Sequence, residues 1–237
     1  MRYLQSYQFV FVSPKWMQNF GIAVLCQFVP ILGPIVLIGY AFDIIEGMLR
    51  DGEENYPDFD ANRLMPYFSR GAWPFIIQLI VALPLTLIIF VTVLVFYAII
   101  LTSSGSPPWW VIFLFLGLFF VVLFLSLVIL PFVVVPLSLR AGLCKSFKEA
   151  FNREFYFDFV KKCWRELLLA ELFLFCSSQL LILIGMCVFC VGSYVAAAWI
   201  MLARHHLMYQ VYLRYLERGG IPPVVKDERV QPGEVAG

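Results

Sequence analysis

Few ionisable or amide side chains lie inside the apolar stretches of the sequence, and those that do are the first candidates for chemistry. Glu171 is the one charged residue between Leu167 and Ala203. An acidic group inside an apolar segment is a candidate for a functional role, because its burial is costly unless it is used or paired. The plainer interpretation is that Glu171 reaches water or pairs with a neighbouring Lys or Arg. Gln179, farther along the same stretch, is more typical of hydrogen bonding between helices.

An acidic loop from Asp51 to Asp60 is the most distinctive polar stretch, and it contains the candidate residues Asp58 and Asp60. Its first acidic and amide side chains alternate as they do in a calcium-binding EF-hand loop. The pattern then fails, because Tyr56 stands where such a loop needs glycine and Asn62 where it needs glutamate. A structured turn stabilised by aspartate and proline accounts for the same residues without a metal.

His205 and His206 are candidates for metal binding, and Cys187 and Cys190 have the spacing of a redox pair. Adjacent residues on a helix point about 100° apart, so the two histidines are poor joint ligands. A straight helix would place His205 about 22 Å from Cys190, whereas zinc ligands lie within about 2.3 Å of the metal. The apolar surroundings of the cysteines do not stabilise a thiolate. We interpret the histidines, with Arg204, as marking the membrane–water boundary, and we expect no metal or other cofactor.

Sequence motifs of common catalytic sites are missing from the chain. It has no G-x-S-x-G, P-loop, H-E-x-x-H or G-x-G-x-x-G pattern, and these are the patterns that mark nucleophile, phosphate, zinc and dinucleotide sites. Paired carboxylates within the apolar stretches, which a proton relay would need, are also missing. We therefore expect that the protein is not an enzyme.

The composition indicates a membrane protein. Of the 237 residues, 62% are hydrophobic and 14% are charged, whereas soluble domains are about half apolar and about a quarter charged. A net charge of +1 argues against a nucleic-acid partner, which requires a basic stripe. We therefore expect an all-α integral membrane protein.

Four apolar stretches reach the roughly 20 residues that are needed to cross a membrane. The last of them, residues 167–203, is too long for one helix, and Gly185 and Gly192 offer places for a turn. The prediction is a single domain, residues 1–216, followed by a short disordered tail over 217–237. Its bundle has five membrane helices, or six embedded segments in the alternative, over residues 20–42, 73–101, 109–139, 166–184 and 190–210.

The distribution of Lys and Arg predicts the orientation in the membrane. The turn at 102–108 has neither residue, whereas the segments 43–72 and 140–166 and the C-terminal tail have many. Such residues concentrate in cytoplasmic loops, so we expect the tail to be cytoplasmic and the protein to lie in the cell membrane. The first stretch remains open, because residues 20–42 either cross the membrane or re-enter it at Pro30–Pro34.

Two segments have the pattern of amphipathic helices that lie in the headgroup layer. In residues 143–164, phenylalanines recur at a helical spacing between charged residues, and after Arg204 apolar and tyrosine residues do the same up to Gly219. The sequence therefore predicts one or two interfacial helices beside the bundle.

Several motifs resemble a prokaryotic membrane family that is catalogued as domain of unknown function 4013. They are Pro30-Ile31-Leu32-Gly33-Pro34 with Gly39-Tyr40, Tyr56-Pro57-Asp58-Phe59-Asp60, Gly71-x-Trp73, and Ala203-x-His205-x-Leu207-x-x-Gln210-x-Tyr212. The resemblance implies a multi-helix protein of a bacterial or archaeal cell membrane. It implies no activity and no catalytic residue.

Two functions fit these features. The first is a non-enzymatic scaffold or accessory subunit, with another membrane protein or a second copy as its partner and anionic lipid headgroups on its basic face. The alternative is a transporter or channel for a small or lipid-like solute, since prolines and glycines in the spans could break helices around a site. A lipid enzyme would need Asp43, Glu46, His205 and His206 to converge. We do not expect the first and last segments to be neighbours.

Overall fold

The computed structural model describes residues 1–53, 57–102 and 108–222, with the backbone alone at Leu127, Phe189 and Cys190. Three predictions lie partly outside this range: the acidic loop at 54–56, the polar turn at 103–107 and the tail from residue 223. Within the described ranges every regular element is helical and no strand occurs, which confirms the all-α class.

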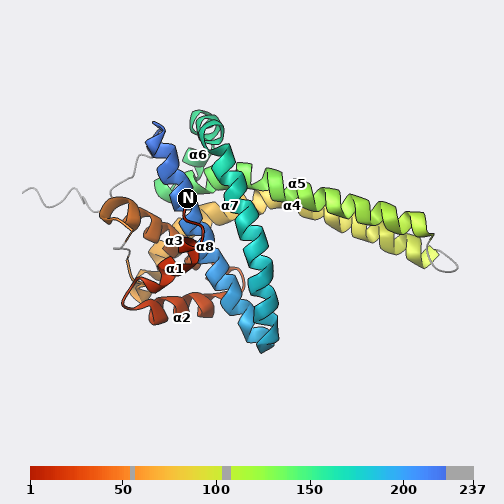
Figure 1. The fold of residues 1–237 in the computed structure, drawn as a ribbon, viewed down its shortest axis with the longest axis horizontal. Coiled ribbons are helices and arrows are strands. Elements are labelled where there is room, and N and C mark those ends of the chain that lie inside the picture. Colours follow the sequence, from red (N-terminus) through yellow and green to blue (C-terminus); the bar gives the residue numbers. More distant parts are fainter. Residues whose placement is uncertain (54–56, 103–107, 223–237) are drawn as a thin grey trace, which may run out of the picture.

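The described helices form a compact head from which two hairpins project in different directions (Figure 1). The head is built from the N-terminal helices, α3 and α6, together with the inner parts of α4, α5, α7 and α8. The elements are α1 Gln5–Gln8, η1 Phe9–Phe11, α2 Trp16–Gln27, α3 Leu32–Asp51, η2 Ala61–Arg63, α4 Leu64–Thr102, α5 Trp109–Cys144, α6 Phe147–Ala150, α7 Arg153–Cys187 and α8 Phe189–Glu217.

A single helix over residues 20–42 is not present, so this prediction is corrected. Helix α2 ends at Gln27 and α3 starts at Leu32. Pro30 cannot donate a backbone hydrogen bond, and Ile31 has φ 68°, so the helix cannot continue through these residues. The break lies at the proline segment where the re-entrant alternative placed it, and α3 then extends to Asp51 instead of ending near residue 42.

Helices α3 and α4 cross so closely that two glycines are required. A Cβ atom on Gly39 would lie 1.8 Å from the carbonyl oxygen of Tyr67, and one on Gly71 would lie 1.9 Å from that of Ile35. Both distances are far inside van der Waals contact. The crossing brings the polar middle of α3 against the start of α4, which creates the site described below.

The hairpin of α4 and α5 extends far beyond the head (Figure 1). Its two helices contact each other through the stacked rings of Phe96 and Phe115, whose centroids are 4.1 Å apart, and Val111 and Val122 of α5 are buried. Most of its other large side chains are exposed. The hairpin therefore presents an apolar surface on its outer faces.

The second hairpin joins α7 to α8 at Val188, between the two glycines that the sequence identified. A Cβ atom on Gly185 would lie 2.6 Å from the carbonyl oxygen of Gly192, and one on Gly192 would lie 2.2 Å from that of Gly185. The two glycines thus allow the helices to touch directly beside the turn, as small residues do in membrane helix pairs.

The separate interfacial helices are not present either. Residues from Arg153 onward belong to α7, and residues after Arg204 continue α8 to Glu217. Two phenylalanines of the face expected to meet lipid pack in the core, where Phe155 and Phe159 lie against Tyr215 at ring distances of 5.4 and 4.9 Å, while Phe151 is 50% exposed. Each amphipathic face covers the other, because the hairpin brings the start of α7 beside the end of α8.

Helices α3, α4, α5 and α7 are long and apolar enough to cross a membrane. Helix α8, where the sequence predicts a span over residues 190–210, is not among the helices that meet this criterion in the described chain. The reason is its C-terminal half, which includes buried His205, His206 and Gln210.

Candidate functional site

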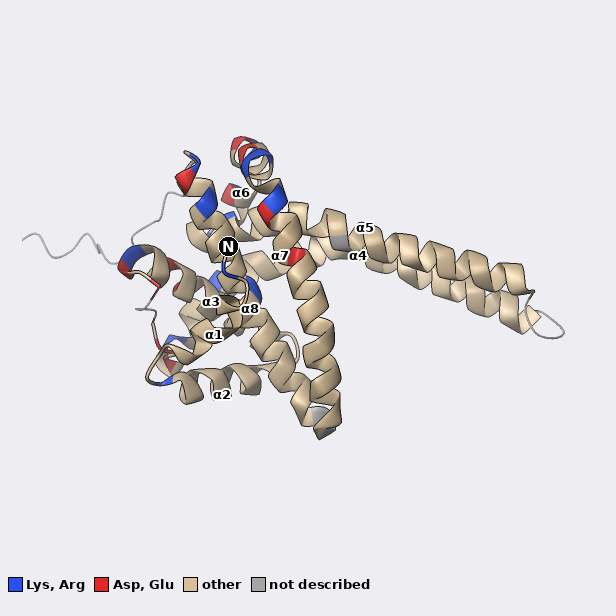
Figure 2. Ribbon diagram, viewed as in Figure 1, with Lys and Arg blue, Asp and Glu red and all other residues tan. Residues whose placement is uncertain are grey.

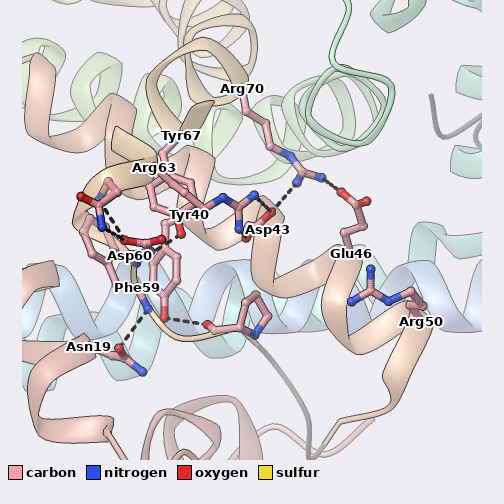
Figure 3. A network of polar contacts seen from close by, with 12 residues as sticks. Asn19, Tyr40, Asp43, Glu46, Arg50, Phe59, Asp60, Arg63, Tyr67 and Arg70 are labelled. Carbon is pink, nitrogen blue, oxygen red and sulfur yellow. Dashed lines mark hydrogen bonds and ion pairs between the residues drawn. The ribbon is translucent and has the colours of Figure 1, made fainter. Parts of the chain in front are cut away.

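The main polar cluster lies in the head where α3, α4 and α5 meet (Figure 3). Asp43 of α3 lies between two arginines, with Arg63 Nη1 at 3.0 Å from its Oδ2 and Arg70 Nη1 at 3.2 Å from its Oδ1. Arg70 also forms an ion pair with Glu46, at 2.7 Å. Figure 3 shows the side chains of Asp43 and Glu46, one turn apart on α3, both directed at Arg70.

Arg70 is the most deeply buried charge of the cluster, because its side chain is only 5% exposed. Its Nε donates a hydrogen bond of 3.0 Å to the carbonyl oxygen of Gly142, near the end of α5. One guanidinium therefore connects three helices, and its planar fork suits several acceptors at once. Arg70 was not among the residues predicted from the sequence, although its position directly before Gly71, at the start of an apolar run, was a signal.

Asp43 also lines a cavity of about 140 Å³ together with Arg63, Arg70, Trp73 and Lys145. Its ion pairs with Arg63 and Arg70 hold η2 and α4 against α3. The cluster has the geometry of a structural clamp.

Asp58 and Asp60 stabilise the loop, in agreement with the turn interpretation. Asp58 Oδ1 accepts hydrogen bonds from Asn19 Nδ2 at 2.9 Å and Ser13 Oγ at 2.8 Å, and Lys15 Nζ lies 3.4 Å from its Oδ2. Donation by Asn19 is the main reason that the pKa of Asp58 lies below its ordinary value. The contacts with Ser13 and Lys15 act in the same direction, while partial burial opposes them.

Asp60 has a local role at the start of η2. Its Oδ1 accepts a hydrogen bond of 2.9 Å from the backbone N–H of Asn62, which is the bond of a helix N-cap. Its backbone N–H donates to the hydroxyl of Tyr67 at 3.4 Å. In the part of the chain that the structure describes, no group of three or more His, Cys, Asp or Glu side chains is arranged to hold a metal ion.

His205 and His206 lie inside the head and not at its surface, which corrects their interpretation as boundary residues. His205 is 5% exposed and places Nδ1 2.8 Å from the carbonyl oxygen of Met201. Its ring meets Phe42 edge-on at 5.5 Å, and His206 stacks on Phe9 at 4.4 Å. The contact with Phe42 also shows that α3 and α8 are neighbours, contrary to expectation.

Glu171 pairs with Arg204 across the α7–α8 hairpin. Arg204 Nη2 lies 3.5 Å from Glu171 Oε1, and the two side chains are 37% and 16% exposed. They lie at nearly equal chain distances from the turn at Val188, so an antiparallel hairpin places them opposite each other. The nearly equal distance of the two residues from the turn was the signal that could have identified Arg204 from the sequence.

The Glu171–Arg204 pair opens onto a cavity of about 360 Å³ between α5 and the α7–α8 hairpin. Its wall is mostly apolar, with leucine, isoleucine, proline and phenylalanine side chains and the hydroxyl groups of Ser126 and Ser178. Gln179 does not line this cavity and is exposed on α7. Of the five candidates from the sequence, Glu171 alone faces this cavity.

Comparison with known proteins gives a family and no activity. The model of the family described as "Protein of unknown function (DUF4013)" matches residues 22–206, which is most of the chain. No curated protein and no solved structure matches. The matched range includes the α3–α4 crossing, the arginine cluster and the Glu171–Arg204 pair. The resemblance seen in the motifs is confirmed: the chain belongs to the DUF4013 family of proteins of unknown function.

Proposed function

We propose that this protein is a non-enzymatic multi-pass protein of the cell membrane, which acts as a scaffold or accessory subunit of a membrane complex. In this proposal the two hairpins enter the lipid and the charged head lies at the cytoplasmic face. The α4–α5 hairpin is the surface that meets a partner, which is another membrane protein or a second copy of the chain.

The observation that carries the proposal is the apolar outer part of the α4–α5 hairpin. Its exposed side chains include Phe90 at 58%, Tyr97 at 59%, Phe113 at 67% and Phe124 at 66%. Removing apolar surface from water is worth about 25 cal/mol per Å². A continuous surface of exposed apolar side chains marks contact with a membrane or a protein. The hairpin therefore needs lipid or a partner around it.

Length and charge support the placement in lipid. The part of α4 beyond the head, residues 79–102, is about 36 Å long, which matches a hydrocarbon layer of about 30 Å. Every Lys and Arg lies outside residues 71–139 and 172–203, and the charges gather in the head, away from the outer ends of both hairpins (Figure 2). The concentration of Lys and Arg in the head fits a cytoplasmic location, where such residues meet anionic lipid headgroups.

The absence of enzymatic activity remains part of the proposal. It is supported by the way the described charges of the head are used. Arg70, Asp43 and Glu46 bind one another, and Arg140 donates to the carbonyl oxygen and the carboxylate of Glu149 at 2.9 and 3.1 Å. Such pairing stabilises helix contacts and offers no activated nucleophile.

Site-specific photo-crosslinking in native membranes tests the scaffold role. The photoreactive residue p-benzoyl-phenylalanine would replace Phe113 or Phe124 on the hairpin, and Phe157 on the head as a control of matched exposure, at 67%. The proposal predicts a discrete protein adduct from the hairpin positions and none from Phe157. Adducts with lipid alone at both hairpin positions would contradict it.

The cavity beside Glu171 favours a second candidate, a carrier for a lipid-like solute. A bundle packed without a cavity would have argued for a scaffold alone, whereas the described chain has an apolar-walled cavity that contains an ion pair. The rate at which a fluorescent lipid moves from one leaflet of a vesicle to the other, measured with and without the reconstituted protein, tests this candidate. An unchanged rate would exclude it.

A further inference from the structure

The cavity between the two hairpins combines an apolar wall with one ion pair, Glu171–Arg204, which we call its polar floor. Its wall comes from α5, through Leu123, Leu130 and Pro131, and from α7 and α8, through Phe175 and Ile200. Leu123 is 38% exposed, so this wall reaches the outer surface of the molecule. An occupant that extends from the floor to this wall must therefore be polar at one end and apolar at the other.

The polar floor has hydrogen-bonding capacity left over. Arg204 carries five N–H donors, and its described polar contact in the cavity is the single approach to Glu171 at 3.5 Å. Neither side chain has a fully buried polar atom without a partner, so the remaining donors and acceptors are accessible. In lipid, where water is scarce, such groups are stabilised by a polar ligand.

We propose that this cavity binds the headgroup of a zwitterionic phospholipid with a primary ammonium, of the phosphatidylethanolamine class. The phosphate lies against Arg204 and the ammonium lies against Glu171, so each charge of the ligand meets its opposite. The acyl chains extend over Leu123 and Leu130. A choline head fits less well, because its methylated nitrogen has no N–H to donate to the carboxylate. The inference rests on the membrane placement proposed above and goes beyond the scaffold role.

Native mass spectrometry from nanodiscs tests this site. The discs contain equal amounts of phosphatidylethanolamine and phosphatidylcholine with the same acyl chains, and the lipids that remain on the released protein are identified. We expect one retained lipid per protein, and we expect it to be phosphatidylethanolamine about ten times as often as phosphatidylcholine. This ratio corresponds to a difference in binding free energy of about 1.4 kcal/mol. Glu171→Gln should abolish the enrichment, and Arg204→Gln should reduce retention of both lipids.

Two tryptophan variants provide a matched control for the cavity. Leu130→Trp fills the space, whereas Ile129→Trp adds the same ring at a side chain that is 52% exposed and not part of the wall. Leu130→Trp should lose the retained lipid while Ile129→Trp keeps it. Loss in both variants, or in neither, would overturn the site.

The remaining outcomes separate this inference from the membrane placement. Equal retention of the two lipids by a protein that enters the discs overturns the lipid site and leaves the placement intact. Failure of the protein to enter nanodiscs overturns both. Soluble glycerophosphoethanolamine should not displace the lipid at equal concentration, since it lacks the chains. Displacement would mean that the apolar wall contributes nothing and would overturn a lipid as the ligand.

Discussion

Replacement of Arg70 by glutamine is expected to lower the free energy of unfolding by about 3 kcal/mol. Removing one partner of a buried ion pair costs about 3–5 kcal/mol, because an uncompensated charge remains in the interior. The low end applies because Asp43 keeps its second partner, Arg63, and the side chain of Glu46 is 25% exposed and can be hydrated. The carbonyl oxygen of Gly142 loses the donor that Arg70 provides.

The assay is thermal unfolding of the purified protein in one mild detergent, followed by tryptophan fluorescence. At about 2–4 °C per kcal/mol for a chain of this length, the expected decrease in Tm is about 6–12 °C. The matched control is Arg63→Gln, which removes a guanidinium from the same carboxylate but at a side chain that is 47% exposed. An exposed pair contributes about 0–1 kcal/mol. Equal decreases from the two variants, or no decrease from Arg70→Gln, would refute the reasoning.

Three further predictions concern packing and pH. Gly71→Ala should lower Tm strongly, because its Cβ would lie 1.9 Å from a carbonyl oxygen of α3, whereas Gly117→Ala, which has nothing within 4 Å, should leave Tm unchanged or raised. Gly185→Val should cost about 1–3 kcal/mol through overpacking against Gly192, and a melt unchanged from that of the native protein would contradict the close approach. The lowered pKa of Asp58 means that its carboxylate stabilises the fold above its ordinary pKa of about 3.9, and that this contribution is lost as pH falls through the lower folded value. The Tm difference between the native protein and Asp58→Asn should therefore be constant near neutral pH and shrink only in acid, and a difference that shrinks above pH of about 5 would contradict the assignment.

Composition and apolar periodicity were sufficient to predict the all-α class and the two hairpins. The first hairpin follows from a local signal, because a polar turn with Gly and Pro separates two long uncharged runs. The second follows from the length of residues 167–203, which is too great for one span, and from the distribution of Lys and Arg around it. Gly185 and Gly192 located the second turn correctly, because only small residues allow two helices to approach at that point. The structured turn around Asp60 was likewise predictable from turn chemistry.

Contacts between segments that are distant in the sequence could not be predicted in the same way. The phenylalanine face at Phe155 and Phe159 has the pattern of an interfacial helix, and only the folded hairpin supplies Tyr215 as its partner. The break near Pro30 was an open alternative, since prolines are tolerated in membrane helices. Burial of His205 depends on the contact between α3 and α8, which no local pattern encodes.

The candidate site was predicted in part. Glu171 was identified because a lone acid in an apolar run is conspicuous, while its partner Arg204 looked like an ordinary boundary charge. Arg70 was missed because it stands next to an apolar run and resembles a flanking residue. Its importance becomes visible only when Asp43, Glu46 and the carbonyl oxygen of Gly142 converge on it.

Thiol labelling in sealed right-side-out membrane vesicles tests most directly the claim that both hairpins enter the membrane from one cytoplasmic head. Three variants are needed, each with a single cysteine and with the other cysteines replaced. One keeps the exposed native Cys187, and the other two carry Trp109→Cys or Lys161→Cys. Trp109 is 72% exposed near the tip of the α4–α5 hairpin. The account predicts that a membrane-impermeant maleimide labels Cys187 and the Trp109→Cys variant from outside, and labels Lys161→Cys only after the membrane is opened. Labelling of all three positions from the same side would contradict it.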